Sequence, residues 1–167
     1  MRSLPLCLAI LCAGLLVSLA GCGGGTPVTS RAERRTLDET RALQLVEEVL
    51  IERGIPRNRA WSVPLASRRE LDVDLRLAQS RFGIEWISPQ DRADLGDAVP
   101  GPATGGNLRI VPGAGDQEIL LLEHTTYEYV NEREHVQAGL AGARETEERL
   151  RRDVIDFLHY IDGQGGL

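Results

Sequence analysis

Three histidines are the side chains in this chain best suited to acid–base or metal chemistry near neutral pH. His135 follows Glu132 by three residues in a predicted helix, the spacing with which di-iron carboxylate bundles present a Glu–His pair. Such a centre needs two copies of the pair and two further glutamates, and the sequence has one copy. His124 follows Glu123 in a predicted strand, where neighbouring side chains point to opposite faces, and His159 lies near a helix end, where the dipole favours its charged form. We therefore predict no metal site and no cofactor.

Other common catalytic patterns are missing from the sequence. All 19 basic residues are arginine, which excludes lysine nucleophiles, Schiff bases and the P-loop lysine. The chain contains neither a Gly-x-Ser-x-Gly elbow nor a His-Glu-x-x-His zinc motif. A formal net charge of -6 argues against nucleic acid as a partner, because nucleic-acid binders carry a basic stripe. No residue is therefore predicted to be catalytic.

Four aromatic residues are the best candidates for a binding surface: Phe82, Trp86, Tyr127 and Tyr129. Aromatic residues make up only 4% of the chain, yet these fall in two close pairs. If they project beside the loop rich in glycine and proline over 96–107, they form an aromatic patch of the kind that anchors interfaces. The alternative is that Phe82 and Trp86 belong to the core and the tyrosines cover an edge of the sheet.

The elements that position these residues follow from periodicity and capping. Thr36 and Glu39 fit a capping box for a helix over 37–53, and Asn131 is predicted to cap a long helix that reaches Ile161. Ser88 and Pro89 predict the start of a short helix over 89–95. Alternation of apolar and polar residues predicts strands at 61–65, 71–77, 82–87, 108–111 and 118–130.

These elements predict an α+β domain. Most connections between the strands are too short for crossover helices, so we expect a mostly antiparallel sheet of about five strands. The N-terminal helix and the long C-terminal helix are predicted to pack on one face of this sheet. Asp72 and Asp74 fall on the polar face of their strand and are expected to be exposed. The apolar stripe of the long helix is predicted to contain Val136, Leu140, Ala143, Leu150, Val154, Phe157 and Ile161.

The first twenty-two residues have the features of an export signal. Arg2 precedes a run of seventeen almost wholly apolar residues from Leu4 to Ala20, which is at the short limit for a membrane-spanning helix. The run ends in Leu19-Ala20-Gly21-Cys22, which resembles the lipobox of bacterial lipoproteins. The resemblance implies that the leader is removed and that Cys22 becomes a lipid-modified first residue. The alternatives are an ordinary signal peptide and an uncleaved anchor.

The resemblance also divides the chain. Residues 1–21 form the signal peptide, 22–35 the lipid-bearing cysteine and a flexible tether, 36–162 the single domain, and 163–167 a tail expected to fray. Eight tether residues after Cys22 are expected to span roughly 16 Å. Removal of Cys7 and Cys12 with the leader would leave the mature domain without a free thiol, disulfide or thiolate metal site. Gly23 after the cysteine resembles a signal for delivery to the outer membrane, facing the periplasm.

The sequence favours a lipid-anchored protein of the bacterial envelope that binds a partner and has no catalytic role. The predicted partners are the lipid bilayer, through the acyl chains on Cys22, and an envelope protein or the cell-wall polymer. One alternative is an envelope hydrolase that uses His124 and acidic residues near the 96–107 loop. Another is a structural subunit of an envelope complex, which predicts a contiguous exposed apolar patch of several hundred Å².

Overall fold

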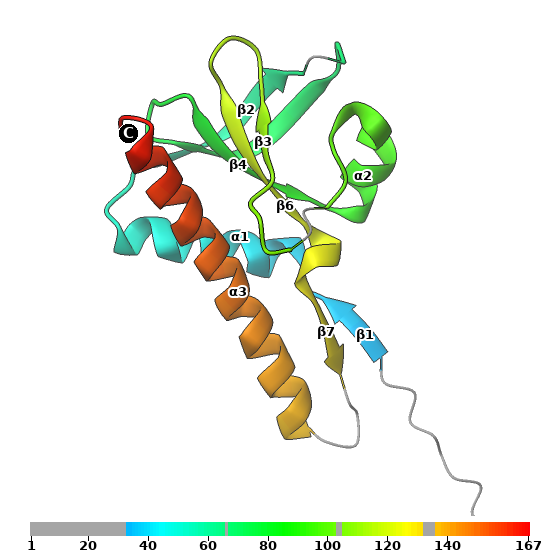
Figure 1. Cartoon of the computed structure of the whole chain (residues 1–167). Helices are drawn as coiled ribbons and strands as arrows, with labels where there is room; N and C mark the ends of the chain where they lie inside the picture. The colour runs from blue at the N-terminus through cyan, green and yellow to red at the C-terminus, as the bar shows by residue number, and fades with distance from the viewer. Residues whose placement is uncertain (1–32, 66, 103–104, 132–135) are drawn as a thin grey trace, which may run out of the picture.

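A computed structural model describes residues 33–65, 67–102, 105–131 and 136–167. Five strands form one sheet in the order β2-β3-β4-β6-β5, and β1 and β7 form a separate two-stranded ribbon (Figure 1). The strands are β1 (Glu33–Thr36), β2 (Arg57–Pro64), β3 (Glu70–Leu77), β4 (Phe82–Ile87), β5 (Ile110–Pro112), β6 (Glu118–Glu123) and β7 (Glu128–Asn131). The helices are α1 (Glu39–Glu52), α2 (Pro89–Leu95) and α3 (Val136–Gly163), with 3₁₀ turns η1 (Gly96–Ala98) and η2 (His124–Tyr127).

The predicted fold class is confirmed. The chain folds as an α+β domain with a mostly antiparallel sheet, and α1 and α3 pack together on one of its faces. One strand pair departs from the antiparallel pattern, because β4 runs parallel to β6 along its whole length. The connection between these two strands contains α2, η1 and β5, so it is long enough for the crossover that a parallel pair requires.

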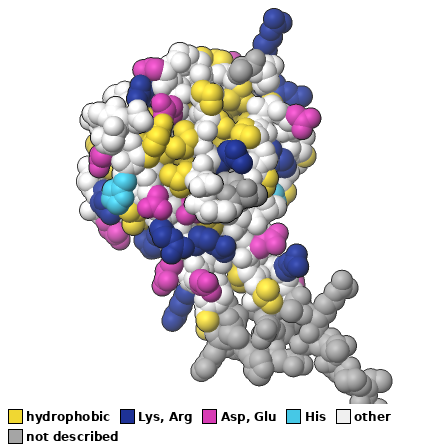
Figure 2. Space-filling view, viewed as in Figure 1, with side chains coloured by type: hydrophobic (Ala, Val, Ile, Leu, Met, Phe, Trp, Pro, Cys, Tyr) yellow, Lys and Arg dark blue, Asp and Glu magenta, His cyan; other side chains and the backbone are white. Residues whose placement is uncertain are grey.

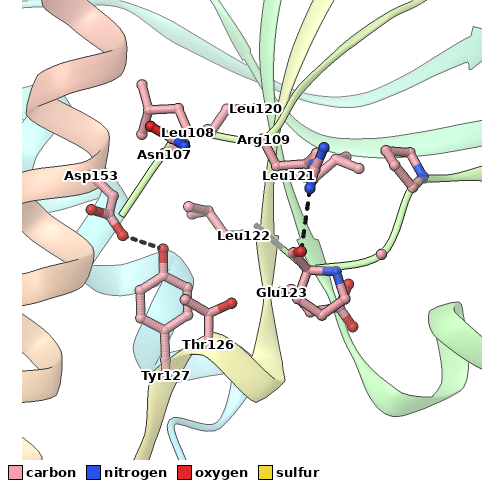
Figure 3. Close-up of a pocket in the computed structure, with 13 residues that line it drawn as sticks. Asn107, Leu108, Arg109, Leu120, Leu121, Leu122, Glu123, Thr126, Tyr127 and Asp153 are labelled. Carbon is pink, nitrogen blue, oxygen red and sulfur yellow. Dashed lines mark hydrogen bonds between the residues drawn. The ribbon is translucent and has the colours of Figure 1, made fainter. Parts of the chain in front are cut away.

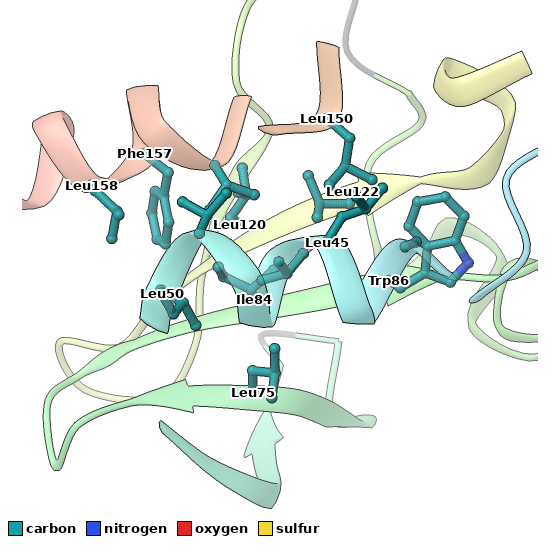
Figure 4. Packing of buried hydrophobic residues seen from close by; sticks show 14 of the residues in the cluster. Leu45, Leu50, Leu75, Ile84, Trp86, Leu120, Leu122, Leu150, Phe157 and Leu158 are labelled. Atoms are coloured by element: carbon teal, nitrogen blue, oxygen red, sulfur yellow. The ribbon is translucent and has the colours of Figure 1, made fainter. Parts of the chain in front are cut away.

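Apolar side chains fill both faces of the five-stranded sheet. The first layer lies under α1 and α3 and includes Leu45, Leu75, Trp86, Leu120 and Phe157 (Figure 4). The second layer lies on the opposite face and contains Val63, Leu65, Leu71, Val73, Ile87, Val99, Val111, Ile119 and Leu121. Gly83 on β4 leaves room for this second layer, since a Cβ there would come within 2.9 Å of the Val73 side chain.

Helix α1 begins two residues later than its predicted capping box. Asp38 is the N-cap, and its side chain accepts a hydrogen bond from the backbone N–H of Arg41 at 2.9 Å. Thr36, the predicted cap, is instead the last residue of β1 and pairs with Glu128. Leu37 donates its N–H to the carbonyl of Tyr127 at 3.2 Å, which fixes the chain before the helix. The strand pairing therefore overrides the local capping pattern.

The predicted strand over 118–130 is divided into two. Strand β6 ends at Glu123, η2 turns the chain, and β7 continues in the separate ribbon with β1. Asn131 pairs with Glu33 at the end of this ribbon, so the prediction that Asn131 caps the long helix is wrong. Residues 33–35, predicted as tether, belong to β1; the rest of the predicted tether and the leader lie outside the described residues.

Helix α3 packs on the core with only part of its length. Leu150, Val154, Phe157 and Ile161 of the predicted stripe are buried, and so is Leu158, which the predicted stripe did not contain. Leu140 is 56% exposed, so its placement in the stripe was wrong. The physical reason is that the first part of α3 extends past the core and contacts β7 instead, where Gly142 lies against the backbone of Val130.

We call the projecting unit the arm and define it as β1, β7 and residues 136–146 of α3. Figure 1 shows the arm extending from the end of the domain at which the described chain begins, at β1. At the opposite end of α3, the N–H groups of Gln164 and Gly166 both donate to the carbonyl of Ile161, so the tail begins as a hydrogen-bonded turn. Within the described ranges, no helix has the length and apolarity to cross a bilayer.

Candidate functional site

The predicted aromatic patch is wrong for three of its four members. Phe82, Trp86 and Tyr127 are each only 2% exposed and belong to the layer under the helices. Trp86 stacks on Tyr127 at a centroid distance of 5.5 Å, and Phe82 meets Phe157 edge to face at 6.3 Å. Tyr129 is half-buried on the arm and packs against the same layer. These rings stabilise the core and do not form the predicted aromatic patch.

A hollow opens at the end of β6, where the short strand β5 stops covering its edge. The hollow is shallow and partly open to solvent, and its enclosed volume is only about 20 Å³. Its floor is apolar and comes mainly from β6, and its rim combines a proline-containing loop with polar groups from η2 and α3 (Figure 3). The residues that line it are Pro100, Gly101, Pro102, Asn107, Leu108, Arg109, Leu120, Leu121, Leu122, Glu123, Thr126, Tyr127 and Asp153.

Tyr127 and Asp153 form the polar group at one side of the hollow. The Tyr127 hydroxyl donates to Oδ2 of Asp153 at 2.8 Å. Burial and the neighbouring carboxylate raise the pKa of Tyr127, so the phenol keeps its proton and remains a donor. Burial also raises the pKa of Asp153, while the hydrogen bond from Tyr127 opposes that shift. A carboxylate held by one oxygen in this way has its other oxygen available to accept from a ligand.

An arginine clamp holds the loop that forms the rim. Arg92 on α2 binds the carboxylate of Glu123 with two nitrogens, and Glu123 is only 5% exposed. The same guanidinium donates to the carbonyls of Gly96, Val99 and Pro100 at 3.1 to 3.3 Å. The buried carboxylate of Glu123 therefore holds Arg92 in place, and Arg92 in turn holds the backbone of the loop that forms the rim of the hollow.

Arg109 ties the other end of the same loop. Its Nη2 donates to the carbonyl of Pro102 at 3.3 Å, while its Nε is buried and has no hydrogen-bond partner among the residues that the structure describes (Figure 3). A buried donor without a partner costs free energy. Movement of the Arg109 side chain toward an acceptor on a ligand would relieve that cost.

His124 does not share the hollow with the acidic residues. Its Nδ1 lies 3.0 Å from the carbonyl of Ile87 and 3.5 Å from Oε1 of Glu123, and the ring is not among the groups that line the hollow. Glu123 already binds Arg92, so it is not poised to orient His124 as a base. His159 is exposed on α3, and His135 lies outside the described residues. Across the described part of the chain, no three potential ligands gather around a possible metal position.

A second group of carboxyls lies inside the sheet and escaped the sequence reasoning. Glu85 on β4 alternates with apolar residues in the sequence, yet it is only 5% exposed. Its Oε2 accepts from the N–H of Asp74 at 2.8 Å, and Oδ2 of Asp74 accepts from the N–H of Trp86 at 2.9 Å. These bonds replace the strand ladder, because β3 and β4 pair only at Leu75–Ile84 and Arg76–Gly83.

The neighbourhood of Glu85 keeps it neutral. Burial, reinforced by the charge of Asp74, raises the pKa of Glu85 to about 10. Asp72 is exposed as predicted, whereas Asp74 is half-buried, so the prediction that Asp74 is exposed is wrong. Glu85 and Asp74 have a structural role, because their side chains supply hydrogen bonds where β3 and β4 separate.

Comparison of the chain with protein-family models, with curated proteins and with solved structures finds no significant match in any of the three. The site must therefore be judged by its own chemistry. The structure brings together Arg109, Glu123, Tyr127 and Asp153 at the hollow. Of these, the sequence reasoning singled out only Tyr127, and for a different surface. The Tyr127–Asp153 contact joins residues 26 apart in the sequence, and no local pattern announces it.

Proposed function

We propose that this protein is a lipid-anchored component of the bacterial envelope whose folded domain binds a partner. The observation that carries the anchor is the position of Leu19-Ala20-Gly21-Cys22 at the end of the apolar run. The observation that carries the binding role is the hollow at the end of β6. It has an apolar floor, and its rim is held in place by the clamp between Arg92 and Glu123.

The chemistry of the hollow supports binding better than hydrolysis. Hydrolysis by carboxylates or histidine needs a group poised to move a proton next to the substrate. Here the carboxylate of Glu123 is bound in an ion pair with Arg92, and Asp153 accepts a hydrogen bond from the Tyr127 hydroxyl, which keeps its proton. Asp153 and Arg109 can instead bind a donor and an acceptor on a partner, with apolar contact between them. An exposed side chain or terminal group of an envelope protein or of the cell-wall polymer fits this description.

The alternative of a structural subunit is less well supported. Large exposed hydrophobic residues in the described part of the chain are Ile51, Val130, Leu140 and Leu167. They come from α1, β7, α3 and the tail, so they do not form the broad apolar face expected of a permanently buried interface.

The anchor is tested by expressing the full chain in a bacterium with labelled palmitate. We expect the label on the wild-type protein and partition into the detergent phase, and loss of both in Cys22→Ser. Cys12→Ser is the matched control, since Cys12 lies in the leader and should be dispensable for the modification. Label retained by Cys22→Ser, or wild-type protein found in the aqueous phase, would disprove the anchor.

The binding site is tested by crosslinking in intact cells from a photoreactive residue placed at Gly101. This position lines the hollow, is exposed and has no heavy atom within 4 Å of where a Cβ would be. The control is the same residue at Glu52, which is exposed at the end of α1. We expect a discrete adduct from position 101 that is absent from position 52 and is weakened by Asp153→Asn. Equal adducts from both positions, or none from position 101, would count against the hollow as the binding site.

A further inference from the structure

The hollow lies along the part of β6 that β5 leaves uncovered. Strand β5 pairs only with residues 118–120 of β6, and one further backbone hydrogen bond joins the N–H of Leu121 to the carbonyl of Arg109 at 2.8 Å. Within the described residues, no strand pairs with 122–123 on this side of β6. All of residues 120–123 line the hollow, so it follows the edge of the strand rather than one of its faces. An uncovered strand edge is a place where an extended peptide can add as a further strand.

Two charged side chains lie on opposite sides of this edge. Asp153 lies on the side of the helices, because it comes from α3 and accepts from Tyr127 in the layer under the helices. The neighbours of Arg109, Leu108 and Ile110, pack against that same layer. Neighbouring side chains along a strand point to opposite faces, so Arg109 lies on the other side. Figure 3 shows the Tyr127–Asp153 pair on one side of β6 and the Arg109 side chain on the other.

Both charged side chains can make further hydrogen bonds. The buried Nε of Arg109 has no partner among the described residues, and Nη2 makes a long bond of 3.3 Å to the carbonyl of Pro102. A carboxylate in reach would give this guanidinium a charged acceptor. Asp153 accepts from Tyr127 at Oδ2, and a carboxylate has room for several donors.

The hollow is too small to enclose a sugar ring or a ligand of similar size. Its enclosed volume of about 20 Å³ has room for little more than one water molecule, whereas pockets that enclose small molecules hold about 300 Å³ or more. An extended peptide needs no such pocket, because its backbone lies along the strand edge and only its side chains reach inward. Figure 2 shows hydrophobic side chains exposed in the upper part of the domain, on the face where Figure 1 places the β5–β6 hairpin.

We propose that the hollow binds an extended segment of a partner protein, which lies against the uncovered edge of β6. This inference rests on the binding role proposed above for the hollow and names the class of ligand. Because successive side chains of an added strand point to opposite faces, one reaches Asp153 and the next reaches Arg109. Charge complementarity then favours a basic side chain at the first position and an acidic side chain at the second.

The experiment compares two fluorescent pentapeptides of the same composition, both acetylated and amidated. An extended Lys-Glu-Lys-Glu-Lys peptide has all its basic side chains on one face and all its acidic side chains on the other, whereas Lys-Lys-Lys-Glu-Glu mixes them. Binding to the full chain, expressed in a bacterium and purified in detergent, is measured by fluorescence anisotropy. Asp153→Asn and Arg109→Gln each remove one proposed contact. Arg53→Gln, at an exposed position after α1, is the matched control.

We expect the alternating peptide to bind about fivefold more tightly than the block peptide, which is the size of one partly exposed ion pair. Asp153→Asn and Arg109→Gln should each remove this preference, and Arg53→Gln should keep it. Thermal unfolding shows which variants are folded, and either folded variant is sufficient for the test. A preference that survives in the folded variants would overturn the inference.

The remaining outcomes separate this inference from the proposed function. Equal binding of the two peptides, or binding of neither, by protein that still forms the adduct from position 101 would overturn the inference and leave the binding role intact. Soluble cell-wall fragments that bind more tightly than both peptides would also overturn it, because the polymer would then be the ligand. Absence of peptide binding together with absence of the adduct from position 101 would refute the inference and the binding role together.

Discussion

Replacing Glu85 by glutamine should make the protein more stable at neutral and alkaline pH. The folded chain holds a proton on Glu85 up to pH about 10, whereas the unfolded chain releases it near the ordinary value of 4.5. The folded state binds more protons in this range, so the free energy of unfolding falls as pH rises between those two values. Glutamine imitates the neutral acid: its oxygen can accept from the N–H of Asp74, and its NH₂ can donate to the Asp74 carboxylate.

The size of the effect follows from the two pKa values. Each pH unit between them costs about 1.4 kcal/mol, so at pH 7 the wild type has lost about 3 kcal/mol that Glu85→Gln retains. For about 135 folded residues the unfolding entropy is roughly 0.28 kcal/mol per degree, which converts that difference into about 10 °C in Tm. Below pH 4.5 both states of the wild type are protonated, and the two proteins should unfold at similar temperatures.

The assay is thermal unfolding followed by circular dichroism at intervals from pH 4 to pH 8.5. Other titrating groups are common to both proteins, so the difference between the two Tm curves isolates Glu85. Glu52→Gln, at an exposed position on α1, serves as the control and should follow the wild type. Parallel curves for wild type and Glu85→Gln, or a variant that is less stable at pH 8, would refute the assignment of a buried neutral acid.

Two further predictions concern the core and the clamp. Arg92→Ala should lower the free energy of unfolding by about 3–5 kcal/mol, because it leaves the carboxylate of Glu123 buried without its partner. In denaturant titrations, the double variant Arg92→Ala with Glu123→Gln should recover part of this loss. Purely additive effects of the two substitutions would contradict the clamp. Leu50→Ala should lower the free energy of unfolding by about 2–5 kcal/mol and Ile51→Ala by less than about 0.5 kcal/mol, since Leu50 is fully buried while Ile51 is 61% exposed. Similar losses of stability in the two variants would show that α1 is rotated from its described position.

The parts of the fold that could be predicted are those fixed by nearby residues. Ser88 caps α2, with its hydroxyl accepting from the N–H of Asp91 while the Asp91 carboxylate accepts from the N–H of Ser88, and Pro89 begins the helix as its type and position indicate. The alternation over 71–77 predicts the burial along β3, where the four apolar positions are buried and the polar positions between them are exposed or half-buried. These signals act within a few residues, so the sequence alone contains them.

The arm could not be predicted because its contacts join distant residues. Glu33 pairs with Asn131, and only this pairing removes both 33–35 from the tether and Asn131 from the helix cap. Leu140 fits the helical stripe by its spacing, yet α3 extends past the core at this position and leaves Leu140 exposed. A periodic pattern shows which side of a helix is apolar, but it does not show how far along the helix the rest of the protein extends.

The candidate site was missed for a related reason. Both faces of the sheet are covered, so apolar alternation did not determine whether Trp86 or Glu85 faced solvent, and neither does. The polar groups of the hollow come from β6, η2, α3 and the loop before β5, and only the assembled fold brings them together. Binding residues that meet only because their elements lie at the same edge of the sheet, and that share no sequence motif, cannot be identified until the strand order is known.

The parallel pairing of β4 with β6 has a consequence for how the chain folds. Strands β2, β3 and β4 are consecutive antiparallel neighbours, and β5 and β6 form a hairpin, so each group can assemble from short-range contacts. The seam between β4 and β6 requires closure of the whole intervening segment, and the Arg41–Glu147 ion pair joins residues 106 positions apart. We expect these two closures to form the rate-limiting nucleus. Substitutions along the seam, such as Ile84→Val, should therefore slow refolding, whereas Val63→Ala at the outer edge of β2 should mainly accelerate unfolding.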